Sequence, residues 1–225
     1  DVVIALDVSH SMTATDVEPS RMERAQAAAR AIVDLRVADR VSLTTFAGWP
    51  YRLVPMTDDM SVVEYFLPWV RPELVESRQQ GTALAAVIGD AGRAVQARER
   101  SGAVPVLVIL TDGEAHGAAP AALDSARALA AAGVRIWTGG VGTEEGGALL
   151  VSRSSGAPLL GGSGAQVVAG YDADLLRDIA RIGGGTFHDI GDDRGVADLV
   201  ADLQALRGGQ SVTQRAAFDP TGLLV

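Results

Sequence analysis

Two uninterrupted apolar runs, each followed at once by a polar loop, constrain the fold of this chain most strongly. Residues 2–6 and 106–110 contain no polar side chain, and Asp7 and Asp112 come directly or one residue after them. Unbroken apolar runs of this length are typical of strands buried on both faces of a parallel sheet. In open α/β sheets, ligands bind at the carboxyl ends of the strands, so both aspartates are expected at that edge.

The rest of the chain alternates between strand and helix patterns, which indicates an α/β fold with a doubly wound, mostly parallel sheet and helices on both faces. The run 51–54, after a turn at 48–50, is expected to pair with the strand at 41–46 as a single antiparallel edge strand. Helices are expected over 21–35, from Asp58 or Asp59 through 66, and over 82–98, 119–132, 172–182 and 194–206, with further strands at 134–141 and 186–190.

The chain is expected to form one domain over residues 1–207. With 225 residues and 48% hydrophobic content, it is long enough for one well-buried α/β domain and short for two. Between 142 and 170 the pattern weakens into glycine, serine and short apolar patches. We interpret this stretch as an insertion of the same domain, in which 149–151 can pair with 166–168 as a small hairpin. Residues 208–225 are expected to be a polar tail.

Composition excludes several kinds of partner and site. The 28 acidic residues outnumber the 19 basic ones and give a net charge of −9, which argues against nucleic acid as a partner. The chain has no cysteine, so a disulfide framework and a thiolate metal site are both impossible. No apolar stretch reaches the length of a membrane span.

Oxygen-bearing side chains from three distant segments are expected to meet at one divalent cation. The first segment supplies one carboxylate and two hydroxyls at alternate positions, the second a hydroxyl at a helix start, and the third a carboxylate after a strand. A hard cation such as Mg²⁺ accepts this ligand set, and Mn²⁺ or Ca²⁺ would suit it too. Hydroxyl ligands leave the ion positively charged, so an acidic group of a partner can complete its shell. The expected ligands are Asp7, Ser9, Ser11, Thr82 and Asp112.

The first and third segments also have an ordinary interpretation, and their residues allow two catalytic alternatives. Taken alone, the first segment is typical of a turn followed by a helix cap, and the third of a turn after a strand. A nucleophile at Ser9 or Ser11 would need His116 as its base, but the chain has no nucleophile elbow. A metal hydrolase would need Glu114 as its base. We expect a binding module and no enzyme, with possible ligand contacts around the cation from His10, Trp49, Glu114 and His116.

The ligand pattern resembles the von Willebrand factor A-type domain, whose metal-ion-dependent adhesion site uses Asp-x-Ser-x-Ser, a separate Thr and a separate Asp. All five positions match this sequence. Residues 11–21, 46–48, 80–84 and 141–146 further resemble the bacterial Bat-type, aerotolerance-related members of that family.

The resemblance implies a Rossmann-like fold and a cation-dependent contact with an Asp or Glu of a partner protein. For Bat-type proteins it further implies a MoxR-type AAA+ ATPase or other Bat-type proteins as partners, in stress tolerance or metalloprotein maturation. The domain is then expected between helices that anchor it in the bacterial inner membrane, on the periplasmic side, with the cytoplasmic side as the alternative. An inert A domain with a vestigial site is the other alternative.

Overall fold

The computed structural model describes residues 1–72, 83–96, 104–115, 117–151 and 156–217. Its main sheet has six strands in the order β3-β2-β1-β4-β5-β8. All neighbouring pairs are parallel except β2 and β3, so the predicted single antiparallel edge strand is confirmed. The strands are β1 (Val2–Asp7), β2 (Val41–Phe46), β3 (Pro50–Thr57), β4 (Val106–Thr111), β5 (Arg135–Gly140) and β8 (Gly184–Asp189).

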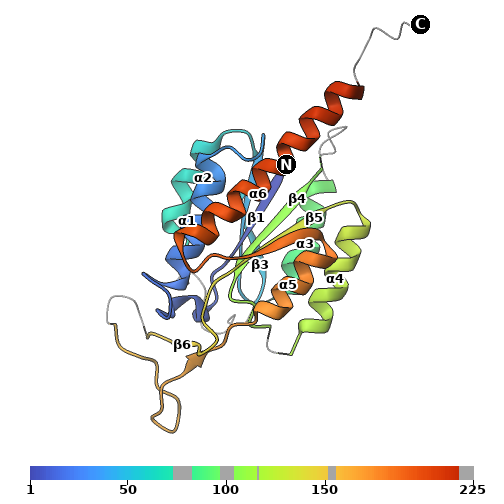
Figure 1. The fold of residues 1–225 in the computed structure, drawn as a ribbon. Coiled ribbons are helices and arrows are strands. Elements are labelled where there is room, and N and C mark those ends of the chain that lie inside the picture. Colours follow the sequence, from blue (N-terminus) through green and yellow to red (C-terminus); the bar gives the residue numbers. More distant parts are fainter. Residues whose placement is uncertain (73–82, 97–103, 116, 152–155, 218–225) are drawn as a thin grey trace, which may run out of the picture.

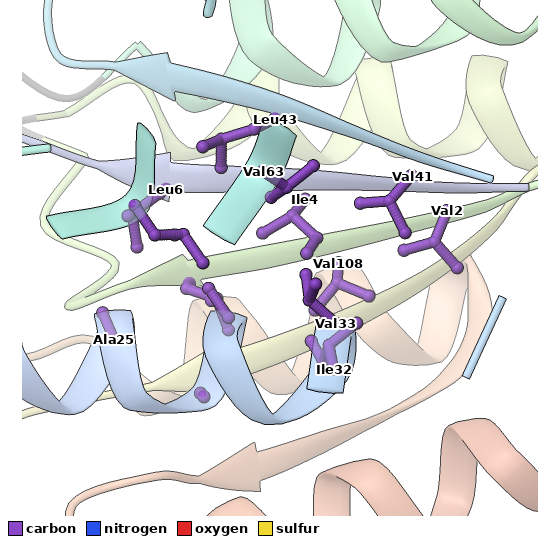
Figure 2. Packing of buried hydrophobic residues seen from close by; sticks show 14 of the residues in the cluster. Val2, Ile4, Leu6, Ala25, Ile32, Val33, Val41, Leu43, Val63 and Val108 are labelled. Carbon is purple, nitrogen blue, oxygen red and sulfur yellow. The ribbon is translucent and has the colours of Figure 1, made fainter. Parts of the chain in front are cut away.

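Helices cover both faces of this sheet (Figure 1). One hydrophobic cluster joins the sheet to α1, α2 and α6, and a second joins it to α3, α4 and α5. Figure 2 shows Val2, Ile4 and Leu6 of β1 in the first cluster, on the side of the sheet that α1 covers with Ala25, Ile32 and Val33. The predicted doubly wound fold is therefore confirmed. The helices are α1 (Arg21–Asp34), α2 (Met60–Phe66), α3 (Leu84–Gln96), α4 (Ala119–Ala131), α5 (Ala173–Ile182) and α6 (Asp193–Ala217), with short 3-10 turns η1 (His10–Thr13) and η2 (Leu67–Trp69).

Side-chain caps fix the starts of three helices. The Ser20 hydroxyl accepts a hydrogen bond from the Glu23 N–H at 3.2 Å before α1. Asp59 accepts from the Ser61 N–H at 3.1 Å before α2, and Asp172 accepts from the Leu175 N–H at 2.9 Å before α5. Such caps satisfy N–H groups that a helix leaves unpaired at its amino end.

The segment between β5 and α5, residues 142–170, lies outside the main sheet and projects from the carboxyl ends of its strands (Figure 1). Its own two-stranded antiparallel sheet pairs β6 (Gly147–Ala148) with β7 (Val168–Ala169). Isolated bridges join Leu150 to Pro158 and Leu160 to Gln166. An antiparallel pairing is thus present near the predicted one, and the Leu149 N–H donates to the Val167 carbonyl at 2.9 Å. The predicted bounds of 149–151 and 166–168 are wrong, because β6 ends before residue 149 and Leu150 pairs with Pro158 instead. We call residues 142–170 the insertion.

The carboxyl-terminal helix is longer than the sequence indicates. We expected a helix over 194–206 and a polar tail over 208–225, but α6 runs to Ala217. The sequence predicts that the helix ends before Gly208 and Gly209. Glycine keeps its backbone N–H, however, so it weakens a helix without removing its hydrogen bonds. Residues 218–225 lie outside the described part of the chain, and the domain end at 207 stays a prediction. Among the described residues, no helix combines the length and apolar character needed to cross a bilayer.

Candidate metal centre

Strands β1 and β4 bring two of the predicted ligands to the same edge of the sheet. The strands are parallel neighbours in which Leu6 lies opposite Leu110, so both strands end at the same level of the sheet. The Thr111 hydroxyl donates a hydrogen bond of 2.5 Å to Oδ2 of Asp7 and thereby connects the two strand ends. Asp7 and Asp112 are both completely buried, which makes an uncompensated charge on either of them costly.

The loop after β1 adds two hydroxyls to the Asp7 carboxylate. The Ser9 N–H donates to Oδ1 of Asp7 at 2.8 Å, and the hydroxyl oxygens of Ser9 and Ser11 lie 2.8 Å apart. Both serines are buried, with exposed fractions of 4% and 7%. Three of the predicted ligands are therefore connected at the end of β1, Asp7 to Ser9 through a backbone N–H and Ser9 to Ser11 through their hydroxyls.

Arg21, which we did not predict as a site residue, lies completely buried between two aspartates. Its Nη1 donates to Oδ2 of Asp112 at 3.0 Å, while its Nε and Nη2 donate to the two carboxylate oxygens of Asp16 at 2.8 Å each. Burial alone would raise the pKa of Asp16, but the hydrogen bonds and charge of Arg21 hold this pKa below its ordinary value. Asp16 also accepts hydrogen bonds from the N–H and hydroxyl of Thr143, at 2.9 and 3.1 Å.

The electrostatics of this cluster favour the entry of a cation. Burial, and then the negative charge of Asp112, raise the pKa of Asp7 to about 7, because the hydrogen bonds from Thr111 and Ser9 offset these effects only in part. Arg21 already divides its positive charge between Asp16 and Asp112. Within the described ranges, no three His, Asp or Glu side chains converge. A cation bound here would therefore use serine hydroxyls as well as carboxylates, a ligand set that fits a hard ion.

The raised pKa of Asp7 predicts an unusual pH dependence for the stability of the metal-free domain. A carboxyl whose pKa is about 7 when folded and 3.8 when unfolded binds more protons in the folded state between these values. Its contribution to stability is therefore complete below about pH 4, falls as the pH rises to 7, and is constant above that. Urea unfolding in the presence of a chelator from pH 4 to 8 measures this slope, and Asp7→Asn should flatten it. An equal slope in both proteins would contradict the raised pKa of Asp7.

The remaining predicted residues lie in different settings. Thr82 and His116 lie outside the described residues, although the Ala83 N–H donates to the Ala47 carbonyl at 2.7 Å and so brings the start of α3 to the carboxyl end of β2. Trp49 is 75% exposed in the turn before β3. The possible ligand contacts of these residues, and of those below, stay predictions.

Glu114 and His10 both contact the insertion. The Glu114 carboxylate lies beside Gly170, and its N–H donates to Oδ1 of Asp112 at 3.1 Å. Nε2 of His10 lies 2.7 Å from the Leu150 carbonyl oxygen, so this ring is turned toward the insertion. Since both Asp112 oxygens accept hydrogen bonds from Arg21 or Glu114, nothing in the described residues orients this carboxylate for a Ser-His-Asp arrangement.

The order of the strands and the helices on both faces define a doubly wound α/β domain, with buried aspartates and serines at the carboxyl edge of its sheet. A sequence profile of the von Willebrand factor type A domain matches residues 2–114. The chain therefore belongs to the von Willebrand factor type A domain family, which confirms the resemblance noted in the sequence.

Two solved structures from Bacteroides are similar to almost the whole chain. The conserved hypothetical protein BatB from Bacteroides thetaiotaomicron has a TM-score of 0.80 and 28% sequence identity, covering 92% of this chain and 98% of its own. An aerotolerance-related membrane protein from Bacteroides fragilis, carrying multiple mutations to serine, has a TM-score of 0.81 and 30% identity over the same shares. These similarities relate the domain to the bacterial Bat-type proteins, as predicted.

A curated relative extends beyond this chain. The UPF0353 protein of Nocardia farcinica is 29% identical over 203 residues, which cover 83% of this chain but 57% of that protein. The chain thus spans little more than half the length of this relative. Membership of the von Willebrand factor type A family, together with the similarity to Bat-type proteins, is consistent with a protein interaction module.

Proposed function

We propose that the chain is a metal-dependent interaction module that binds an acidic group of a partner protein through a divalent cation. Asp7, Ser9, Ser11 and Asp112 would hold the ion, with Thr82 as the fifth predicted ligand, and Mg²⁺ is the preferred ion. The observation that carries this proposal is the burial of Asp7 and Asp112 beside two adjoining serine hydroxyls. When bound, the cation would supply positive charge and an open coordination position for a carboxylate.

The protein's own residues would prepare the site for that carboxylate. Thr111 and the Ser9 N–H hold the two oxygens of Asp7, while Arg21 and the Glu114 N–H hold those of Asp112. These hydrogen bonds fix the orientation of both acidic groups, a support that commonly strengthens metal binding. Serine ligands carry no charge, so a bound ion would keep a net attraction for an acidic partner.

For the whole protein, we propose a role in stress tolerance or in the maturation of proteins that include metalloenzymes, with a MoxR-type AAA+ ATPase or other Bat-type proteins as partners. The similarity to an aerotolerance-related membrane protein supports this role and an anchor in the bacterial inner membrane. We further propose that the domain faces the periplasm. The match to the Nocardia relative covers 57% of that protein, and its remaining part has no counterpart in the matched region.

Mn²⁺ offers a direct test of the open coordination position. We expect Mn²⁺ to bind the domain and enhance the relaxation of water protons. Adding acetate, a minimal carboxylate, should then lower this enhancement, because the carboxylate displaces water from the ion. The uncharged analogue acetamide serves as the control and should have little effect. If Mn²⁺ binds but acetate and acetamide act alike, the ion has no position that prefers a carboxylate, and the proposed mode of partner binding is wrong.

The same preparation distinguishes the other functional classes. A metal hydrolase using Glu114 would turn over ester or phosphoester substrates in the presence of Mn²⁺ and would lose this activity in Glu114→Gln. An inert domain would bind Mn²⁺ too weakly to detect at millimolar concentration. We expect neither result.

A further inference from the structure

The insertion is attached to the segment that carries the predicted metal ligands. Eight residues after its start, the Leu150 carbonyl oxygen lies 2.7 Å from Nε2 of His10, and the Leu150 N–H donates to the Thr13 hydroxyl at 3.4 Å. Both contacts fall on the 3-10 turn that contains Ser11. The insertion is therefore held directly by the loop that supplies the serine ligands.

Arg21 and Asp16 hold both ends of the insertion. At its start, Asp16 accepts two hydrogen bonds from Thr143. At its end, Nη1 of Arg21 donates to the Gly170 carbonyl at 2.7 Å and Nη2 donates to the Ala169 carbonyl at 3.4 Å. One buried arginine-aspartate pair thus joins the first and last parts of the insertion, through Thr143 and Gly170, which are 27 positions apart in the sequence.

A single nitrogen of Arg21 connects the insertion to a predicted metal ligand. Its Nη1 donates both to Oδ2 of Asp112 and to the Gly170 carbonyl, so these two acceptors share one group. Just after the insertion, the Asp172 N–H donates to the Asp112 carbonyl at 2.9 Å, which adds a backbone hydrogen bond next to this contact. A change in the charge on Asp112 therefore alters the strength of the hydrogen bond from Nη1 to the Gly170 carbonyl.

We infer that Arg21 is a positioning residue that couples cation binding to how rigidly the insertion is held. This inference rests on the proposed function and adds a regulation of that same site. With a cation held by Asp112, this carboxylate would attract the guanidinium of Arg21 less strongly, and the hydrogen bonds of Arg21 to Asp16, Ala169 and Gly170 would strengthen. By thermodynamic reciprocity, a partner that steadies the insertion raises the affinity for the cation.

Amide hydrogen exchange of the intact domain, with saturating Mg²⁺ or with a chelator, tests this coupling. The backbone bonds that close the insertion provide the probes, since the Leu149, Leu159 and Val167 N–H groups each donate to another segment of the insertion. We expect Mg²⁺ to slow their exchange by at least about fivefold, the lower end of common coupling strengths. An unchanged rate at all three groups would overturn the inference.

Arg21→Lys separates positioning from charge. Lysine keeps the positive charge but lacks the planar fork that reaches two carboxylates and two carbonyls together. We expect this variant to bind Mg²⁺ while losing the effect of Mg²⁺ on the exchange of the insertion. Arg40→Lys is the matched control, because Arg40 is also buried and donates from Nε and Nη2 to the Asp1 carboxylate at the opposite ends of the strands. This control should keep the full effect.

The outcomes distinguish this inference from the proposed function. If the unsubstituted domain fails to bind Mg²⁺ by calorimetry, the proposed function fails and the inference falls with it. If Mg²⁺ binds and Arg21→Lys still transmits its effect to the insertion, the inference alone is overturned. Should Arg21→Lys not fold, Asp16→Asn removes the charge of the other half of the pair, and the same loss of coupling is expected.

Discussion

Replacing Ser9 by alanine is expected to weaken Mg²⁺ or Mn²⁺ binding by more than about 100-fold, since groups that merely support metal ligands already contribute 10–100-fold. The substitution removes the hydroxyl that lies 2.8 Å from Ser11 Oγ. It leaves the backbone N–H of residue 9, which holds Asp7, in place. The fold should therefore survive while the cation loses one ligand and the hydroxyl that orients another.

Calorimetric titration with each ion measures this effect directly. Ser42→Ala is the matched control, because Ser42 is equally buried and donates to the Val54 carbonyl at 2.9 Å, within the β2–β3 pair. Its affinity for the ions should be unchanged. Asp112→Ala should lose binding as completely as Ser9→Ala, through the loss of a carboxylate. If both site variants still bind the ions as the unsubstituted domain does, the assignment of this site is wrong.

The central sheet could be predicted because its inner strands are buried on both faces. Residues 2–6 and 106–110 face helices on each side, so every position is apolar and the run stands out from its surroundings. Strand β3, at the edge, has a single fully buried residue and gave a weaker signal, and its predicted range of 51–54 covers only part of Pro50–Thr57. The strength of the pattern thus follows the number of faces that are covered.

The contacts that position the insertion could not be predicted from its sequence. Glycine, serine and short apolar patches carry little periodicity, and the pairings that the structure shows involve one or two residues each. Its position depends instead on hydrogen bonds to backbone carbonyls, which any residue provides. Such contacts leave no mark in the pattern of the insertion itself.

Arg21 did leave a signal in the sequence, although we did not use it. Arg21 is four, seven and eleven positions before Ala25, Ala28 and Ile32, which all belong to the buried stripe of α1. Residues at these spacings share one face of a helix. A charged residue in line with such a stripe is buried, and a buried charge needs a partner. The nearby Asp16 and the site aspartates were the available partners.

Replacing Arg21 by methionine is expected to destabilise the metal-free domain by about 3–5 kcal/mol, the usual effect of removing one partner from a buried ion pair. Methionine is similar in length, so the main loss is electrostatic. Asp112 is completely buried and Asp16 nearly so, and both would lose their cationic neighbour. Urea unfolding at pH 7.5 in the presence of a chelator should show a clearly lower midpoint with a similar slope.

Added Mg²⁺ then distinguishes the metal centre from an ordinary buried ion pair. A cation beside Asp112 replaces part of the positive charge that the substitution removed, so Mg²⁺ should stabilise Arg21→Met more than it stabilises the unsubstituted domain. Arg40→Met also breaks a buried pair, but far from the site, and should gain no more from Mg²⁺ than the unsubstituted domain does. Equal gains in all three proteins would mean that Arg21 and the cation do not share the charge of Asp112. A greater gain in Arg21→Met alone would show that the arginine and the ion both compensate the charge of Asp112.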